Sequence, residues 1–330
     1  MISNNAINAW FLFFCTLGSA WAHRADAQEL KSIRISLSLG SAQLPLWAAR
    51  DAGLFARHGL NAELLGLQVA SRQVQLLLAG DTLAASLSGT TPIRARIEGA
   101  DITIVMGLLN SFTLSVISVP EIKKPGDLKG RLIGVGALGG SPTLLTQRLL
   151  KKWGLETDVK FLATGGYIES VAALEKRRVY AAVLDPPRAY IAKKKFGFIE
   201  LANLGQEFKY ATTVVVARES QLRRERETFT QFAKAVIEGT HLVKTDREFA
   251  IKTLSQMLRS TDRETLEETY RVFSALYERI PYPAVDGIQP ILDEISLQNP
   301  KAKNYKPDDF MDTSIIKQLE QAGFVRNVYR

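Results

Sequence analysis

Two loops rich in small and hydroxyl-bearing residues are the parts of this 330-residue chain that most suggest chemistry. Each loop, at residues 40–42 and 88–91, follows an apolar segment typical of a strand and precedes a segment typical of a helix. At the carboxyl ends of neighbouring strands the loops would lie side by side, where open α/β sheets bind small ligands. Neither loop contains a strong nucleophile or base, so the pattern indicates binding and not catalysis.

A third loop, at residues 139–143, reads Gly-Gly-Ser-Pro-Thr. Ser141 is a favoured N-cap residue, Pro142 stands at the favoured first helical position, and Thr143 places a hydroxyl in the first turn. The free amides and the dipole of such a helix start favour an anionic group. The same residues also suit an ordinary capped helix, so both interpretations stay open.

Two further polar side chains are candidates for a binding cleft. Tyr167 follows the glycine pair 165–166 at a strand–helix junction, where its ring can either line a cleft or pack in the core. Asp185 ends a short apolar segment, where its carboxylate can accept a hydrogen bond from a ligand or from the backbone.

Other kinds of site are disfavoured. Residues 134–139 match GxGxxG, but the next predicted strand ends without the acidic residue that a dinucleotide-binding site needs. Three histidines and one cysteine, Cys15, offer no set of metal ligands, so we expect no metal and no cofactor. Ser141 lacks the GxSxG context of a hydrolase nucleophile, and we expect no catalytic residues.

The first 27 residues are typical of a cleaved leader. Residues 9–18 are almost continuously apolar, and Ala25-Asp-Ala27 offers small residues at the positions that a signal peptidase reads. The apolar run is shorter than the roughly 20 residues that span a bilayer. The run has no Lys or Arg before it, so a retained membrane anchor remains the alternative. We expect cleavage after Ala27 and export to the periplasm.

The amino-acid composition is typical of a globular protein with a hydrophobic core. The chain is 46% hydrophobic and has a formal net charge of +8. Its Lys and Arg residues are scattered in pairs and triplets without interleaved aromatic residues, so we expect no nucleic-acid partner. The length suffices for two lobes with cores, and we expect a monomer.

The order of the predicted elements indicates two α/β lobes. Strands and helices alternate from residue 33 to 109, and a smaller βαβαβ series occupies about 120–212. From residue 220 the pattern is mainly helical. We expect lobe one at 28–118 plus 213–330 and lobe two at 119–212. Extended segments at 115–119 and 213–217 would act as the hinge between two separate cores.

Several segments together carry a family resemblance. These are residues 44–60, Leu-Ala-Gly-Asp at 78–81, residues 125–135, and the spacing from Val-Leu-Asp-Pro at 183–186 to Gly197. With the leader, they resemble the nitrate/taurine/alkanesulfonate branch of the periplasmic substrate-binding proteins of ABC transporters. Residues 178–182 depart from the family pattern, which usually has glycine there.

The resemblance implies a two-lobed α/β fold of the type II periplasmic-binding-protein class, with the helical C-terminal segment packed on the first lobe. Such a receptor closes on a small solute and delivers it to an ABC permease. Fungal thiamine-pyrimidine synthases share the fold, but their Cys-rich motif and active-site histidine are missing here. With Tyr167 added, the expected ligand-binding residues are Gly40, Ser41, Gln43, Ser88, Gly89, Thr90, Gly139, Gly140, Ser141, Thr143, Tyr167 and Asp185.

The solute is expected to be a small organic anion, and its identity stays open. A sulfonate, an aromatic carboxylate or a pyrimidine would each suit hydroxyl-rich loops. An exported enzyme on the same scaffold and a receptor for a signalling partner remain alternatives to transport.

Overall fold

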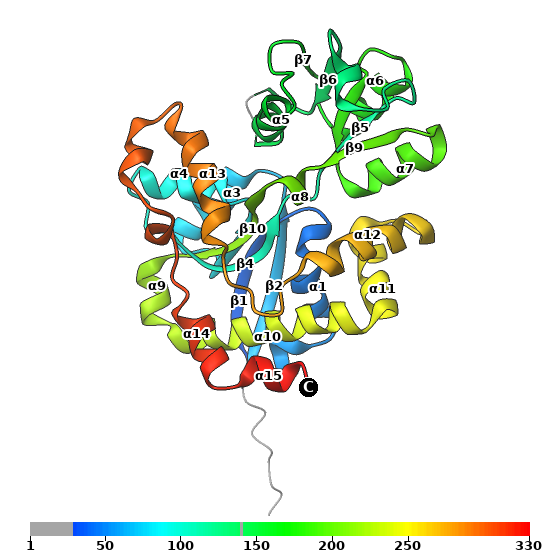
Figure 1. Cartoon of the computed structure of the whole chain (residues 1–330). Helices are drawn as coiled ribbons and strands as arrows, with labels where there is room; N and C mark the ends of the chain where they lie inside the picture. The colour runs from blue at the N-terminus through cyan, green and yellow to red at the C-terminus, as the bar shows by residue number, and fades with distance from the viewer. Residues whose placement is uncertain (1–28, 139–140) are drawn as a thin grey trace, which may run out of the picture.

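The computed structural model describes residues 29–138 and 141–330. Within them, ten strands form two five-stranded sheets, each covered by helices and joined by two chain segments (Figure 1). We call the first sheet with its helices lobe 1, and the second sheet with its helices lobe 2. The predicted leader at residues 1–27 and the predicted ligand residues Gly139 and Gly140 lie outside the described residues.

The lobe 1 sheet has the strand order β2-β1-β3-β10-β4. Strands β1, β2 and β3 run parallel, and β10 returns antiparallel between β3 and β4. In β1 the residues from Ile35 to Leu37 are all buried, because helices cover both faces of the sheet. The strands are β1 Lys31–Ser38, β2 Leu60–Leu67, β3 Ala84–Leu87, β4 Thr103–Ser111 and β10 Lys209–Ala217.

The lobe 2 sheet repeats this arrangement with the order β7-β6-β8-β5-β9. Three parallel strands, β6, β7 and β8, are again followed by one antiparallel strand, here β5, and an outer strand. The β8 sequence Ala-Ala-Val-Leu is fully buried, as expected for a short central strand. The strands are β5 Ser115–Ser118, β6 Leu132–Val135, β7 Lys160–Ala163, β8 Ala181–Leu184 and β9 Ile199–Asn203.

Before β10, each helix of the chain lies after a strand of its own lobe. In lobe 1 these are α1 Leu44–Asp51, α2 Leu54–Arg57, α3 Ala70–Ala79 and α4 Thr90–Ile97. In lobe 2 they are α5 Ser141–Lys152, α6 Tyr167–Glu175 and α7 Pro186–Phe196, with the short α8 Leu204–Glu207 on the way back.

The C-terminal segment is helical and packs mainly on lobe 1, as expected (Figure 1). Helix α10 lies along α1 and buries a face that includes Phe229, Phe232 and Val236, at the spacing of one helical stripe. Helix α12 extends further and contacts α7 of lobe 2. The helices are α9 Glu219–Arg224, α10 Arg226–Thr245, α11 Arg247–Leu258, α12 Arg263–Leu276, α13 Val285–Ser296, α14 Ser314–Gln321 and α15 Phe324–Val328; 3-10 turns lie at 41–43, 125–128, 300–304 and 307–310.

The crossings between the lobes differ from those expected. Residues 115–118 are strand β5 of the second sheet, and residues 213–217 belong to β10 of the first sheet. The chain passes between the lobes at 112–114 and 204–208 instead. These crossings are shifted because β-branched residues at both predicted positions pair within a sheet. The lobe limits at 28–118 with 213–330 and at 119–212 stay a prediction, and the sheet pairing would move them by a few residues.

The two lobes do not have wholly separate cores. One buried apolar cluster runs from lobe 1 through the crossings into lobe 2, and it includes Phe112, Leu114, Leu204 and Tyr210. The rings of Phe112 and Tyr210 meet edge to face, with 4.7 Å between their centroids. The expectation of two independent cores is therefore wrong at the hinge, where apolar packing opposes free rotation.

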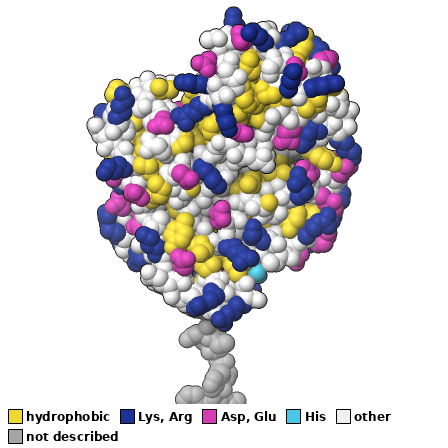
Figure 2. Space-filling model, in the orientation of Figure 1, with side chains coloured by type: hydrophobic (Ala, Val, Ile, Leu, Met, Phe, Trp, Pro, Cys, Tyr) yellow, Lys and Arg dark blue, Asp and Glu magenta, His cyan; other side chains and the backbone are white. Residues whose placement is uncertain are grey.

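The surface in Figure 2 shows Lys and Arg side chains interspersed with Asp and Glu over the visible face. No helix within residues 29–138 and 141–330 combines the length and the apolar character needed to cross a membrane.

Candidate functional site

The predicted binding loops lie at the edges of the two sheets that the crossings join. In lobe 1, strands β1, β3 and β4 end at this edge and β10 begins there. In lobe 2, strands β6, β7 and β8 end at the corresponding edge and β5 begins there. Both crossings start and finish at these edges, so the edges lie towards one another (Figure 1).

Two helix N-termini from opposite lobes meet in this region. Thr90 is the first residue of α4 in lobe 1, and Ser141 is the first residue of α5 in lobe 2. Their hydroxyl oxygens are 3.4 Å apart. The phenol oxygen of Tyr210, near the start of β10, lies 3.0 Å from Thr90 Oγ1 and 2.5 Å from Ser141 Oγ. Side chains from both lobes therefore share one hydrogen-bonded cluster.

A carboxylate completes this cluster. Oε2 of Glu294, on α13, lies 3.2 Å from the phenol oxygen of Tyr210. Burial raises the pKa of Glu294, although its hydrogen bonds with Tyr210 and Ser141 oppose the rise. Burial also raises the pKa of Tyr210 above its ordinary value, so the phenol stays neutral and donates its single proton to one acceptor at a time.

The start of α4 is fixed by a glycine. The Gly89 N–H donates to the carbonyl oxygen of Ala211 at 3.1 Å. A Cβ atom at position 89 would lie 2.8 Å from that same carbonyl oxygen, so a larger residue would push α4 away from β10. The neighbouring Ser88 is exposed. Gly89 therefore acts as a spacer that brings Thr90 to Tyr210.

The loop after β1 is tied to lobe 1 by its own side chains. Gly40 has a φ of 138°, which glycine adopts most readily. The Gln43 amide is buried, donates to the Ser86 carbonyl oxygen at 3.3 Å and accepts from the Ser86 hydroxyl at 2.6 Å. The Ser41 carbonyl accepts from the Tyr277 hydroxyl at 2.9 Å. In this conformation Gln43 is therefore committed to β3, and its contact with a solute stays a prediction.

In lobe 2, Asp185 and Tyr167 lie close together at the strand ends. Arg188 donates to Asp185 Oδ2 at 2.6 Å. Burial raises the pKa of Asp185, while the charge of Arg188 opposes the rise, and burial raises the pKa of Tyr167 to about 12. The Thr143 hydroxyl donates to the Ala137 carbonyl at 2.8 Å, so it ties the start of α5 to the loop before it.

The structure thus brings Thr90 together with Ser141, and Tyr167 together with Asp185. Tyr210 and Glu294 were not predicted from the sequence. The position of Tyr210 could have been predicted, because the strand that returns from lobe 2 runs antiparallel and must begin at the edge where the parallel strands end. The position of Glu294 could not, since only the packing of α13 on β10 places it there.

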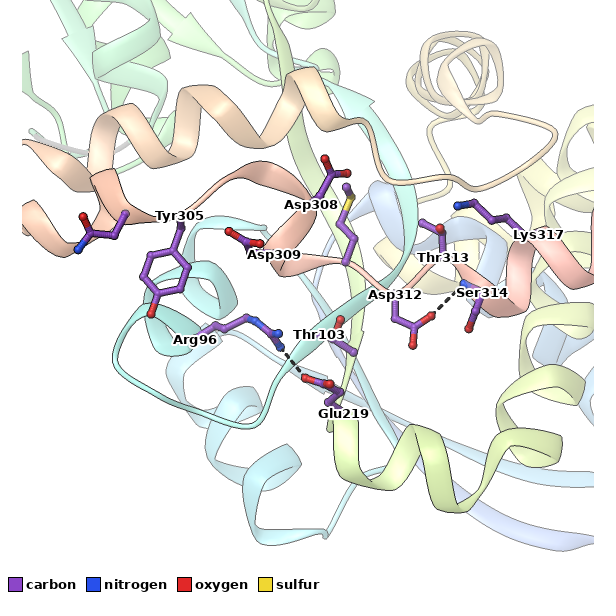
Figure 3. A pocket seen from close by; sticks show the side chains of 12 residues that line it. Arg96, Thr103, Glu219, Tyr305, Asp308, Asp309, Asp312, Thr313, Ser314 and Lys317 are labelled. Carbon is purple, nitrogen blue, oxygen red and sulfur yellow. Dashed lines mark hydrogen bonds and ion pairs between the residues drawn. The ribbon is translucent and has the colours of Figure 1, made fainter.

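A cavity of about 690 Å³ lies elsewhere, on the side of lobe 1 (Figure 3). Several of its charged groups bond neighbours: Arg96 Nη1 lies 3.1 Å from Glu219 Oε2, and Asp312 Oδ1 accepts from the Ser314 N–H at 2.9 Å. None of the predicted ligand residues lines it. We therefore place the candidate site at the sheet edges and not in this cavity.

Among residues 29–138 and 141–330, no group of three or more His, Cys, Asp or Glu side chains is arranged to hold a metal ion.

Comparison with known proteins relates both the sequence and the fold to binding proteins. The family model described as NMT1/THI5 like matches residues 41–250, more than half of the chain. The Bacillus subtilis (strain 168) protein YtlA, provisionally named a binding protein, is 21% identical over 267 residues, which cover 76% of this chain and 79% of YtlA.

Solved structures share the architecture at low identity. The periplasmic aliphatic sulphonate binding protein SsuA of Escherichia coli has a TM-score of 0.68 at 15% identity, covering 85% of this chain and 98% of SsuA. A DSZB mutant in complex with biphenyl-2-sulfinic acid has a TM-score of 0.66 at 13% identity, covering 89% of this chain and 100% of that chain. These similarities confirm the two-lobed α/β fold class expected from the sequence.

Proposed function

The chain belongs to the NMT1/THI5-like family, and we propose that it binds a small organic anion between its two lobes and delivers it to an ABC permease. Proteins of this fold include one named for aliphatic sulphonates and one solved with a sulfinic acid. Both ligands are organic acids of sulfur, which supports an acidic solute for this chain as well.

The observation that carries the proposal is the meeting of two helix N-termini across the lobe boundary. Helices α4 and α5 begin at Thr90 and Ser141, whose hydroxyls are 3.4 Å apart. A helix N-terminus offers unpaired N–H groups and the positive end of the helix dipole. Two such termini from different lobes would hold one anion more strongly in a closed arrangement than in an open one. Solute binding would then favour closure.

The site is better suited to binding than to catalysis. A nucleophilic Ser141 would need a free neighbouring base, and its two polar partners, the Tyr210 phenol at 2.5 Å and the Glu294 carboxylate, already bond each other. Burial raises the pKa of Tyr210, so the phenol serves as a hydrogen-bond donor at neutral pH and not as a base. We therefore propose a receptor and not an exported enzyme on this scaffold.

Export and partners are part of the same proposal. The apolar run at residues 9–18 and the Ala25-Asp-Ala27 sequence support a cleaved leader and a periplasmic location. We propose that the mature protein is a monomer that has the transmembrane subunits of a permease as its partner and no nucleic-acid partner. A receptor that passes its signal to a signalling protein would use the same cleft, and it would differ in the partner that is captured with the closed form.

A screen of organic anions against the mature protein tests the proposal. Sulfonates, sulfinates, aromatic carboxylates and uncharged pyrimidines are compared by thermal shift, and each hit is titrated by calorimetry. Ser141→Ala and Thr90→Val should weaken the binding of a true solute by about 0.5–3 kcal/mol, the range for the loss of a neutral or charged hydrogen bond.

Ser220→Ala is the matched control, because its hydroxyl bonds Asp101 on lobe 1 outside the candidate site. A solute that binds equally well to Ser141→Ala, Thr90→Val and the control would contradict the assigned site. A screen in which only uncharged compounds bind would contradict the anionic solute.

A further inference from the structure

The edge of the lobe 2 sheet that faces away from the candidate site is rich in basic side chains. Strands β6, β7, β8 and β9 begin at this edge and β5 ends there. Four chain segments therefore come together, at residues 121–131, 158–160, 175–178 and 193–200, and we call this surface the basic end of lobe 2. Lys and Arg side chains are visible at the top and along the right side of the upper lobe in Figure 2.

Contacts between the segments show that they share one surface. Arg177 Nε lies 2.9 Å from Glu121 Oε1, and Lys129 Nζ lies 3.4 Å from Asp158 Oδ2. The Gly130 N–H also donates to the Asp158 carbonyl oxygen at 2.9 Å. Five strands lie side by side here, and at about 4.8 Å between strands their edge is roughly 20 Å wide. The basic end is therefore a broad surface.

Cations outnumber carboxylates at the basic end. Its four segments contain eleven Lys and Arg residues and five Asp and Glu residues, so they hold most of the formal net charge of +8 of the chain. Seven of the basic residues are exposed and form no ion pair with any residue that the structure describes: Lys123, Lys124, Arg131, Lys160, Lys176, Arg178 and Lys195.

The acidic residues do not cancel this charge. The other four basic side chains are engaged: Arg177 and Lys129 in the contacts above, Lys193 with Glu200 at 2.6 Å, and Lys194 with Glu264 of lobe 1. Within the described chain, Asp127 and Glu175 are the carboxylates of the four segments that form no ion pair. Seven unpaired cations therefore face two unpaired carboxylates, and the basic end stays positive after its ion pairs are counted.

The aromatic rings in and next to the basic end lie against basic side chains. Three cation–π contacts cover them: Arg131 with Tyr180 at 4.3 Å from the ring centroid, Lys195 with Phe196 at 5.0 Å, and Arg177 with Phe198 at 5.9 Å. None of the exposed large hydrophobic residues of the described chain falls in the four segments. Protein hot spots depend on apolar or aromatic anchors, and single-stranded nucleic acids stack their bases on free rings. The basic end therefore suits a partner that is recognised by charge alone.

We propose that the basic end docks on the anionic phospholipid surface of a membrane, through contacts between its Lys and Arg side chains and the headgroup phosphates. An anionic leaflet has a negative surface potential that attracts clustered basic side chains. Its charge is spread over a plane, so it meets side chains from all four segments at once and needs no pocket. The candidate site lies at the opposite edge of the sheet, so a docked protein keeps that site open to solute. This docking goes beyond the proposed solute binding and does not depend on it.

Vesicle binding by the chain from Gln28 to Arg330 tests the proposal. This chain contains every residue that the structure describes and lacks the apolar run at residues 9–18, which has an affinity for lipid of its own. Co-sedimentation compares vesicles of phosphatidylcholine and phosphatidylglycerol in equal parts with vesicles of phosphatidylcholine alone. We expect binding to the anionic vesicles only. Added salt should weaken it, because ions screen charges beyond about 8 Å at physiological ionic strength.

Paired charge reversals test whether the basic end makes the contact. One variant combines Lys123→Glu with Lys124→Glu, in the segment before β6, and another combines Lys176→Glu with Arg178→Glu, in the segment before β8. Each should weaken binding to anionic vesicles by about tenfold or more, since two attractive charges become repulsive. The far-ultraviolet circular dichroism of each variant is compared with that of the wild type to show that the fold is kept.

The matched control combines Lys252→Glu with Lys303→Glu, which makes the same change of net charge at two exposed positions of lobe 1. It should bind anionic vesicles within about twofold of the wild type. The proposal is overturned if anionic and neutral vesicles bind alike, or if either paired variant of the basic end binds as well as this control.

Polyglutamate serves as the probe for a protein partner. If it binds the wild type more tightly than anionic vesicles do, the basic end is a docking surface for an acidic protein and the membrane proposal is overturned. The proposed solute binding depends on Thr90 and Ser141 at the opposite edge, and it stands or falls by the anion screen.

Discussion

Replacement of Tyr210 by phenylalanine isolates the hydrogen bonds that link the two lobes. The phenol oxygen lies 2.5 Å from Ser141 Oγ, 3.0 Å from Thr90 Oγ1 and 3.2 Å from Glu294 Oε2. Only Ser141 belongs to lobe 2, so one of the three contacts crosses the lobe boundary. The ring itself remains, and its edge-to-face packing on Phe112 is kept.

The expected loss of stability and the expected loss of affinity depend on which of these contacts lie within lobe 1 and which one joins the two lobes. The contacts with Thr90 and Glu294 are present whether the lobes are open or closed, so their loss lowers the free energy of unfolding, by about 1–3 kcal/mol. The contact with Ser141 forms only when the lobes are together. A net neutral hydrogen bond contributes about 0.5–1.5 kcal/mol, so closure and solute affinity should fall by about two- to thirteenfold.

Two assays on the same preparations separate these effects. Urea denaturation measures the change in the free energy of unfolding, and calorimetry with an anion identified by screening measures affinity. Tyr282→Phe is the control, since its hydroxyl bonds Glu320 at 2.7 Å within lobe 1 and away from the sheet edges. The reasoning is refuted if Tyr210→Phe loses no more affinity than Tyr282→Phe.

Three further predictions concern pH, processing and motion. Burial raises the pKa of Glu294, so the folded state holds this proton more tightly than the unfolded chain, and stability falls as pH rises through the raised pKa. Acidification from about pH 7 to pH 5 should therefore stabilise the wild type relative to Glu294→Gln. Equal shifts of the melting temperature in the two proteins would contradict this prediction. Mass spectrometry of the exported protein should find an N-terminus at Gln28, after cleavage following Ala27, whereas a retained Met1 would exclude a cleaved leader. Small-angle scattering should show a smaller radius of gyration with saturating solute, and unchanged scattering with a verified solute would rule out ligand-driven closure.

The sequence by itself determined the α/β class, the two series of strands and helices, and the positions of the loops that we predict to bind the solute. These features depend on local patterns. The sequence predicts a strand at 33–39 and a helix at 92–98, and the structure has them at 31–38 and 90–97, because hydrophobic periodicity and N-terminal helix preferences act over short distances. The lobe 2 helix was predicted on the same basis, with Ser141 as its N-cap, and α5 begins one residue earlier, at Ser141 itself.

Only the tertiary structure decided which side chains meet. Residues 115–119 and 213–217 were predicted to be crossings, because extended β-branched segments look alike whether they pair in a sheet or connect two lobes. Their pairing partners, such as Leu184 for Ser115, are distant in sequence. The same holds for Glu294, which is 84 residues from Tyr210 along the chain. Long-range packing of α13 on β10 brings the two together, and no local pattern encodes that contact.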